Sequence, residues 1–373
     1  MRLGIVRQRY TPFGGAERFV ERAIDALLER GVRVSIYTRK WPQARSGRVE
    51  PVVCNPFYLG SLWRDASFAS AVRAALARDR PDVVQSHERI EGCDIFRAGD
   101  GVHRVWLDER IRTGGRSARL RIAANPYHRY MQDAEARMFG SPSLKAVICI
   151  SQMVRDDIRR YFPLPEEKLH VIYNAVDPHE FSPAVRADRV ATRAALGLTD
   201  DDVAFLLVGS DYARKGVATA IRALARLPRE ARLVVVGKDK APERYVRLAH
   251  RAGVGERVIF AGPHKDPRPY LGAADAFVLP TIYDPLSNAV LEALACGLPV
   301  VTSQRCGAGE LVVAHGAGWT CDAIDDAAFA DAMRALLDAD NRTRLAARAI
   351  DAVAALTPQD MTRRLLALYS TLL

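Results

Sequence analysis

Short apolar segments alternate with amphipathic segments along most of the chain. Leu3 to Val6 and Arg33 to Thr38 have the composition of strands, and the segment 16–30 between them repeats apolar residues at helical spacing before Gly31. A strand, a loop, a helix and a second strand in this order predict that the chain opens as a β-loop-α-β unit.

The alternation continues beyond this opening. It predicts helices at 68–78, 153–161, 217–225, 243–252 and 288–296, and strands at 82–85, 146–150, 170–172, 203–208, 232–236, 258–260 and 273–280. Alternation of this kind is typical of parallel sheets covered by helices on both faces.

Asn174 to Pro183 interrupts the pattern with two prolines, and a helical stretch at 186–196 follows before the strand at 203–208. We place a domain boundary there, so that the first domain covers 1–176 and the second begins at 177. The predicted fold class is α/β, with two doubly wound, Rossmann-like domains facing a central cleft. Ligands are expected at the carboxyl ends of the strands.

Composition agrees with a globular protein of two domains, since 26% of the 373 residues are charged and 49% are hydrophobic. The net charge of +10 admits phosphate-bearing ligands, nucleic acid or an anionic membrane surface, and does not choose among them. Six scattered cysteines without a C-x-x-C pair indicate reduced thiols. Because no signal peptide or membrane-spanning stretch is recognisable, a cytoplasmic location is expected.

The segment Tyr283 to Val301 carries Asp284 and Glu292 eight residues apart, around the start of the helix predicted at 288–296. The free amides and positive dipole end of a helix start favour an anion such as a diphosphate. Two carboxylates placed before and inside this helix are able to bind different hydroxyls of one ligand. An ordinary structural ion pair with an arginine is the alternative, and the spacing leaves both interpretations open.

Two glycine-containing loops carry further candidates. Arg214 and Lys215 lie between Gly209 and Gly216 after a predicted strand, where two cations suit a diphosphate that gains charge as it leaves. A solvated pair of cations is the alternative. The pair Gly14-Gly15 precedes the first helix, and it suits either close approach to a ligand or a tight turn. This loop lacks G-x-G-x-x-G, which disfavours a nicotinamide cofactor.

In the first half, the turn from Arg97 to His103 combines Asp100 with a histidine, and either group suits work near a reacting hydroxyl. The alternative is an Asx-type turn with a histidine at the surface. The sequence has no H-E-x-x-H, cysteine cluster or repeated D-x-D. We therefore expect no metal site and metal-independent chemistry.

The segment Arg104 to Tyr130 holds seven arginines against Asp108 and Glu109, so that 7 − 2 gives +5, half of the net charge. Aromatic residues lie between the arginines, a pattern that suits an anionic membrane or a phosphorylated glycolipid. Nucleic acid is disfavoured because no binding motif accompanies the charge. A solvated arginine face is the third interpretation. The arginines are Arg104, Arg110, Arg112, Arg116, Arg119, Arg121 and Arg129.

The motifs PFGGAERF, GSDYARKGV and the segment ending LEALACGLPVV resemble the GT-B glycosyltransferases of family 4, in particular members that build the lipopolysaccharide core. The resemblance covers essentially the whole chain. It implies a retaining, metal-independent transferase without a cofactor, peripheral to the cytoplasmic face of the inner membrane. The enzyme would move a hexose, typically glucose from UDP-glucose, to a lipid-linked saccharide.

The resemblance also assigns roles to residues. Arg214 and Lys215 would neutralise the diphosphate, Glu292 would bind the ribose, and Asp100 and His103 would lie on the acceptor side. The remaining donor-binding positions would be Gly14, Gly15, Gly209, Leu286, Ser287, Asn288 and Ala289. The second domain would cover 177–355, and 356–373, with its helix from about Met361, would return to the first domain.

One departure concerns Asp284, because the family's usual first acid is a glutamate. An aspartate reaches one methylene less far, so the identity of the donor sugar is less secure than the type of reaction. Asp284 is counted with Asp100, Arg214 and Lys215 among the candidate catalytic residues. The rival hypotheses are a sugar-nucleotide epimerase on the same fold and a glycolipid-binding protein that has lost transfer.

Overall fold

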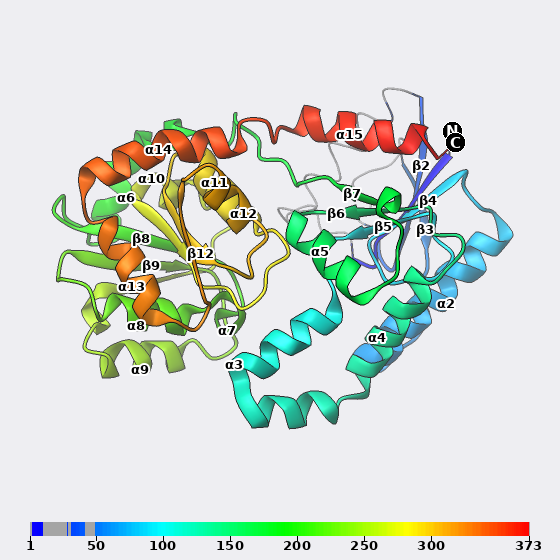
Figure 1. Cartoon of the computed structure of the whole chain (residues 1–373), viewed down its shortest axis with the longest axis horizontal. Helices are drawn as coiled ribbons and strands as arrows, with labels where there is room; N and C mark the ends of the chain where they lie inside the picture. The colour runs from blue at the N-terminus through cyan, green and yellow to red at the C-terminus, as the bar shows by residue number, and fades with distance from the viewer. Residues whose placement is uncertain (1, 10–27, 29–30, 42–48, 373) are drawn as a thin grey trace. The chain divides into compact units, whose positions relative to one another are not determined.

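The computed structural model describes residues 2–9, 28, 31–41 and 49–372. The chain forms two compact units, of which the first comprises Met1–Asn174 with Pro358–Leu373 and the second comprises Ala175–Thr357 (Figure 1). The boundaries expected from the sequence, 176/177 and 355/356, lie within two residues of these divisions.

The first unit is built around a parallel sheet with the strand order β3-β2-β1-β4-β5-β6-β7 in its described part. The strand order reverses at β1, which pairs with β2 on one side and β4 on the other. In doubly wound folds such a reversal is where ligands bind. The strands are β1 (Arg2–Val6), β2 (Arg33–Thr38), β3 (Val49–Val53), β4 (Val83–Ser86), β5 (Ile95–Ala98), β6 (Ala146–Cys149) and β7 (Leu169–Val171).

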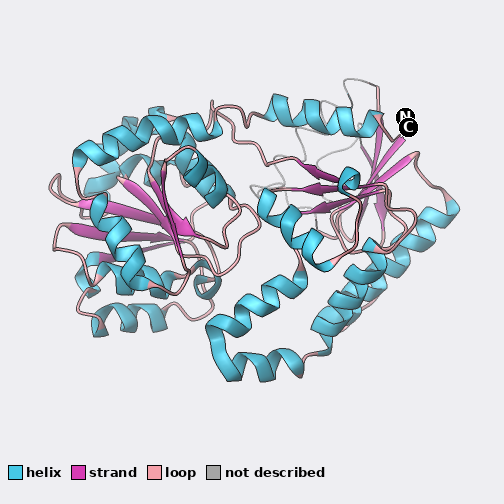
Figure 2. Ribbon diagram, viewed as in Figure 1, coloured by secondary structure: helices cyan, strands magenta, loops and turns pink. Residues whose placement is uncertain are grey.

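The helices described in the first unit cover both faces of this sheet (Figure 2). They are α2 (Gly60–Arg78), α3 (His103–Ala123), α4 (Pro126–Phe139), α5 (Gln152–Tyr161), the 3₁₀ turn η1 (Glu166–Lys168) and α15 (Pro358–Ser370). Helix α15 comes from the end of the chain and packs through Leu365, Leu368 and Tyr369. The Tyr369 hydroxyl donates a hydrogen bond of 2.7 Å to Gln85 Oε1 at the end of β4.

The second unit repeats the plan with a six-stranded parallel sheet in the order β10-β9-β8-β11-β12-β13. Its strands are β8 (Val203–Val208), β9 (Ala231–Val236), β10 (Val258–Gly262), β11 (Ala276–Leu279), β12 (Val300–Ser303) and β13 (Gly318–Cys321). Every residue of β11 and β12 is buried. Continuous burial of this kind is typical of strands covered on both faces.

The helical elements of the second unit also lie on both faces of its sheet (Figure 2). They are η2 (Pro183–Asp188), α6 (Arg189–Ala195), α7 (Tyr212–Lys215), α8 (Val217–Leu224), α9 (Glu243–Arg251), η3 (Gly255–Arg257), α10 (Arg268–Ala273), α11 (Asn288–Ala295), α12 (Gly309–Ala314), α13 (Asp326–Ala335) and α14 (Ala339–Val353). No helix in the described ranges is both long enough and apolar enough to cross a membrane.

The structure differs from the sequence-based elements at several points. Helix α2 begins at Gly60, eight residues before the predicted start at Phe68. The prediction missed its first turns because none of their residues is buried and they lack apolar periodicity. Ala273 ends helix α10 instead of opening strand β11, and the stretch 186–196 divides into η2 and α6. The helix predicted at 16–30 lies almost entirely outside the described residues.

Candidate active site

The short helix α7 follows strand β8 at the carboxyl edge of the second sheet. Its position is fixed by the loop after β9, because the Asp211 N–H donates to Lys238 O at 3.0 Å and the Tyr212 N–H donates to Asp239 Oδ2 at 2.8 Å. The buried Tyr212 hydroxyl also donates to Gly237 O at 2.9 Å. These contacts make a rigid support for the two residues that end α7, Arg214 and Lys215.

The glycines on either side of α7 are required by close contacts. A Cβ atom on Gly209 would lie 2.8 Å from Cγ and Cε of Lys215, so the lysine side chain runs over the bare glycine backbone. Gly216 has φ of +73°, and a Cβ there would lie 1.9 Å from Pro280 O. A larger side chain at Gly209 would displace the Lys215 side chain, and one at Gly216 would clash with the backbone of Pro280.

The cations of α7 meet a carboxylate from a distant part of the chain. Lys215 Nζ lies 2.5 Å from Asp284 Oδ2, and Arg214 Nη1 lies 3.6 Å from the same oxygen. Burial alone would raise the pKa of Asp284, but the charges of Lys215 and Arg214 and the hydrogen bonds from Lys215 and the Leu286 N–H lower it. The carboxylate is therefore ionised. Arg214 Nε also lies 3.9 Å from Oδ2 of the largely exposed Asp211, so Asp284 is the buried carboxylate that the two cations share.

The turn before α11 has a strained residue. Ser287 has φ of +63° and ψ of +93°, outside the regions that residues other than glycine normally adopt. Its buried hydroxyl makes no hydrogen bond within the described part of the chain, although a serine at a helix start usually caps the first amides. Strain and an unpaired hydroxyl each cost of order 1–3 kcal/mol. Both together indicate a turn shaped for a ligand.

Helix α11 exposes one face near its start. Asn288, Ala289 and Glu292 keep partial exposure, while the other residues of this fully described helix are buried. Positions i, i+1 and i+4 lie on the same side of a helix. The accessible side of α11 is therefore formed by three of the residues that the sequence assigned to donor binding. That assignment remains a prediction.

Asp100 and His103 lie beside the carboxyl end of β5, in the first unit. The Asp100 side chain is 72% exposed and lies 4.0 Å from Arg89 Nη1. His103 is buried at the first position of α3, so a surface histidine, one interpretation of this turn, is wrong. Asp100 is thus open to solvent in its unit, whereas His103 is held within a polar network.

Glu135, which the sequence did not single out, organises this network. The carboxylate is 1% exposed, accepts hydrogen bonds from the His103 N–H at 2.9 and 3.1 Å, and accepts another from Arg89 Nε at 2.7 Å. It therefore satisfies the start of α3, where Val102 provides no side-chain cap. Glu135 lies on α4, 32 residues from His103, and no sequence motif connects them.

The histidine itself is uncharged at neutral pH. Burial, followed by the charges of Arg89, His128 and Arg110, lowers the pKa of His103 to about 3. Its Nε2 lies 3.1 Å from His128 Nδ1, and burial and Arg110 lower the pKa of His128 as well. A neutral imidazole pair is suited to hydrogen bonds with hydroxyl groups and not to holding an anion.

The basic segment from Arg104 is mostly helical. Helix α3 kinks at Gly115, whose φ is 61° and ψ is −154°, and the following turns expose Arg116, Arg119, Arg121 and Leu120, the last at 72%. Figure 1 shows α3 and α4 extending from the sheet of the first unit as a helical arm. We call residues 103–139 the arm.

An exposed apolar cluster lies at the start of α2, which contacts α4 of the arm. Phe57, Leu59 and Trp63 are 72%, 69% and 46% exposed, and the rings of Phe57 and Trp63 meet edge to face with centroids 5.6 Å apart. The Tyr127 hydroxyl donates 2.9 Å to Asp65 Oδ2, which connects α4 with the start of α2. The cluster was not predicted from the sequence, since apolar side chains in a loop do not by themselves indicate exposure.

The sequence also singled out the glycine pair of the first loop and predicted the absence of a metal site. Gly14 and Gly15 lie outside the described residues. Within the ranges that are described, no group of three His, Cys, Asp or Glu side chains is arranged to hold a metal ion. Metal independence itself stays a prediction. All six cysteines are free and buried.

Comparison with known proteins identifies the family. Residues 188–352 match the model "Glycosyl transferases group 1", and residues 13–180 match "Glycosyltransferase Family 4". The D-inositol 3-phosphate glycosyltransferase of Xylanimonas cellulosilytica is 30% identical over 367 residues, which cover 90% of this chain and 86% of that protein. The chain belongs to the family 4 glycosyltransferases. The resemblance noted in the sequence is therefore confirmed.

Further comparisons concern one relative by sequence and two solved structures by fold. The lipopolysaccharide glucosyltransferase WaaG of Escherichia coli K12 is 28% identical over 308 residues, covering 80% of this chain and 79% of its own. A crystal structure of WaaG superposes with a TM-score of 0.81 at 24% identity, over 96% of this chain and 98% of that one. Anabaena HepE in complex with UDP and glucose superposes with a TM-score of 0.72 at 20% identity and full coverage of both chains. The GT-B class predicted from the sequence is confirmed.

Proposed function

We propose that this family 4 glycosyltransferase moves a hexose, glucose, from UDP-glucose to a lipid-linked saccharide of the lipopolysaccharide core type, with retention of anomeric configuration. The relative WaaG is a lipopolysaccharide glucosyltransferase, which supports this choice of acceptor, and the complex of HepE with UDP and glucose supports the choice of donor. The residues of the chain support the proposal through the arrangement at the carboxyl edge of the second sheet.

The observation that carries the proposal is the pair of cations held at the end of α7, together with the turn at Ser287. Arg214 and Lys215 share the buried carboxylate of Asp284, and Arg214 also lies 3.9 Å from the exposed carboxylate of Asp211. The unpaired Ser287 hydroxyl lies at the start of α11. A nucleoside diphosphate leaving group gains negative charge as the glycosidic bond breaks. Fixed cations that meet this charge in a buried setting lower the barrier without reorganising at the moment of reaction.

The residues around this charge take the following roles in the proposal. Lys215 and Arg214 bind the diphosphate, Ser287 and the amides of Leu286 to Ala289 bind its oxygens, and Glu292 on the accessible side of α11 binds the ribose. Asp284 holds Lys215 in place at 2.5 Å and lies beside the donor. In the first unit, Asp100 and the neutral His103 serve the hydroxyl groups of the sugars.

The mechanism we propose retains configuration without a protein nucleophile. The diphosphate leaves and the acceptor hydroxyl enters on the same face of the transferred sugar, and no metal ion takes part. NMR of the product tests the stereochemistry, and an inverted anomer would refute the retaining mechanism. Turnover that is abolished by EDTA and restored by a divalent cation would refute metal independence.

A panel of UDP-, GDP- and ADP-sugars tests the donor. A true donor stabilises the folded protein by about 2.7 kcal/mol at one hundred times its dissociation constant. Transfer to lipid-linked saccharides is then measured with the donor that stabilises most. Conversion of the nucleotide sugar without any acceptor would favour the epimerase hypothesis, and binding without turnover on every acceptor would favour a binding protein.

We also propose that the first unit contacts the cytoplasmic face of the inner membrane. The arm supplies exposed arginines for anionic headgroups, and Phe57, Leu59 and Trp63 supply side chains suited to the interface between headgroups and acyl chains. Liposomes with anionic lipid should bind the protein better than neutral liposomes at low salt. Equal binding to both would refute the electrostatic part, and unchanged binding of a Phe57→Ser, Trp63→Ser variant would refute the aromatic part.

A further inference from the structure

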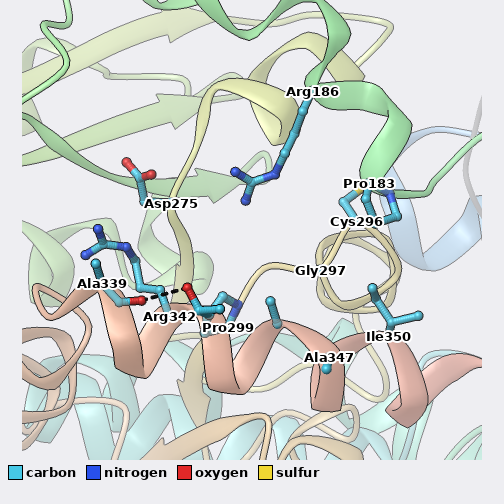
Figure 3. Close-up of a pocket in the computed structure, with 12 residues that line it drawn as sticks. Pro183, Arg186, Asp275, Cys296, Gly297, Pro299, Ala339, Arg342, Ala347 and Ile350 are labelled. Atoms are coloured by element: carbon cyan, nitrogen blue, oxygen red, sulfur yellow. Dashed lines mark hydrogen bonds between the residues drawn. The ribbon is translucent and has the colours of Figure 1, made fainter.

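A cavity lies at the opposite edge of the second sheet from the candidate active site. It has a volume of about 500 Å³, within the range of small-molecule sites. Asp275 and Pro299, which precede strands β11 and β12, line it together with Gly297 after the end of α11 (Figure 3). The cavity is therefore at the amino ends of the strands, whereas the candidate donor site follows their carboxyl ends.

The walls of this cavity combine apolar surface with two guanidinium groups. Pro183, Pro299, Cys296 and Ile350 contribute apolar contacts. Arg186 enters from η2 and Arg342 from α14, as Figure 3 shows. Burial raises the pKa of the Cys296 thiol to about 12, so this group acts as an apolar wall and not as a nucleophile.

The carboxylate of the cavity does not satisfy these arginines. Asp275 is already held by Arg189 at 2.6 Å and by Arg193 at 3.1 Å, both outside the cavity lining. The Arg186 guanidinium makes no hydrogen bond or ion pair with any residue in the described ranges. Partial burial and the charge of Arg189 lower the pKa of Arg186, which shows that its surroundings disfavour the cation. An anion in the cavity would reverse that effect.

Arg342 differs from Arg186 in having a structural role. Its Nη1 donates hydrogen bonds of 2.8 Å to Leu336 O and Leu337 O, at the end of α13. These bonds fix the side chain beside the cavity and use one of its terminal nitrogens. An arginine has five N–H donors, so a bound anion does not have to displace them.

We propose that this cavity binds a small organic anion, a phosphate or carboxylate carried on an apolar body, between Arg186 and Arg342. Guanidinium groups pair with both kinds of anion through two parallel hydrogen bonds. The apolar body packs against Pro183, Cys296 and Ile350. The site is separate from sugar transfer and does not depend on the proposed donor or acceptor.

Methyl NMR of the full-length protein tests the proposal with two reporters. The Ile350 methyl lines the cavity, and Ile282, whose N–H donates to Arg214 O at 2.8 Å, reports on the candidate donor site. Phenyl phosphate, benzoate, inorganic phosphate and phenol are titrated separately. We expect phenyl phosphate or benzoate to shift the Ile350 signal, and comparison of the two identifies the preferred anion. Inorganic phosphate and phenol, which each offer half of the contacts, should bind more weakly.

Substitutions make the assignment specific. Arg186→Gln should weaken binding at Ile350 about tenfold, since one charge-assisted contact is lost, and should leave the thermal midpoint near that of the wild type. Arg344→Gln on the exposed face of α14 is the matched control and should bind as the wild type. The proposal is overturned if only Ile282 responds, if phenol binds as well as the anions, or if Arg186→Gln binds as tightly as the wild type.

Discussion

The carboxyl edges of the two sheets differ in the charge of their candidate site residues. At the edge of the second sheet, Arg214 and Lys215 share one buried carboxylate, that of Asp284, and a buried hydroxyl is left without a partner in the described structure. At the edge of the first, the carboxylate of Glu135 is satisfied by Arg89 and by the His103 amide, and the histidine pair beside it is neutral. The first arrangement suits an anion and the second suits neutral hydroxyl groups.

The two edges therefore differ in how many of their polar groups still lack a partner. In the second unit, a ligand with negatively charged oxygens would bind the two cations and would give the Ser287 hydroxyl a hydrogen-bond partner. In the first unit, Glu135, Arg89 and His103 already form hydrogen bonds with one another without a ligand. They therefore hold the local structure in place and do not gain partners on binding. Each of the following experiments tests one side of this difference.

Removal of Lys215 should have the largest effect on catalysis. Lys215→Met leaves the departing diphosphate with one cation fewer, and we expect kcat/KM to fall by about 10² to 10³. Steady-state kinetics with the most stabilising nucleotide sugar measures this. Arg226→Gln, in the exposed pair with Asp326, is the control and should stay near wild type. A similar loss in both variants would contradict a specific role for Lys215.

Removal of the charge of Glu135 should have the largest effect on stability. Glu135→Gln leaves Arg89 buried with only weaker interactions with Asp100 and Glu88, and we expect the free energy of unfolding to fall by about 3 kcal/mol. Urea denaturation measures the loss. Asp79→Asn, in the exposed pair with Arg2, should change stability by less than about 1 kcal/mol. Equal losses in the two variants would show that the burial of the Arg89–Glu135 pair does not add to its effect on stability.

The pH dependence of stability should report the neutral histidine. The pKa of His103 in the folded protein is about 3, below the value of about 6.5 in the unfolded chain, so the unfolded state binds more protons between these values. The contribution of neutral His103 to the free energy of unfolding is complete above pH 6.5 and is lost as the pH falls toward 3.

We expect His103 to account for about 2 kcal/mol of the stability lost between pH 6.5 and pH 5, from about 1.36 kcal/mol per pH unit. His128 acts in the same direction. His103→Asn should flatten the curve, and the exposed His315→Asn should not. A wild-type slope in His103→Asn would mean that other groups carry the proton uptake.

The strain at Ser287 should give the smallest effect, with opposite signs for stability and binding. Ser287→Gly accommodates φ of +63° and should raise the free energy of unfolding by about 1 kcal/mol, while it weakens binding of the donor about tenfold. Ser287→Ala removes only the hydroxyl, so it should weaken binding without relieving strain. Thermal denaturation measures the effect of the strain on stability, and nucleotide titration measures the effect of the hydroxyl on donor binding. Unchanged donor binding in both variants would exclude the hydroxyl from the site.

The sequence predicted the elements with strong local signals. Strands β2 and β8 have the predicted bounds, and helix α11 begins at Asn288 as expected. The short strands β3, β5, β12 and β13 were missed, although the similarly short β4, β6 and β11 were predicted. The glycines beside Arg214 and Lys215 signalled a special loop, and close contacts at Gly209 and Gly216 explain it.

The partners of the candidate residues could not be predicted, because they come from distant parts of the chain. Lys215 and Asp284 are 69 residues apart and belong to separate sequence motifs, with nothing in either motif to indicate the other. The burial of His103 depends on Glu135 and His128, both on α4. Contacts of this range follow from the packing of the sheet and its helices, which local patterns do not encode.

The contact between Tyr369 and Gln85 has a consequence for the order of folding. Helix α15 belongs to the first unit, and the Tyr369 hydroxyl reaches β4 across 284 residues of sequence. The ribosome therefore releases the whole second unit before it releases the last helix of the first. A growing chain is able to fold Ala175–Thr357 as soon as it emerges, since domains generally fold as units. The first unit, although it begins the chain, is the one completed last.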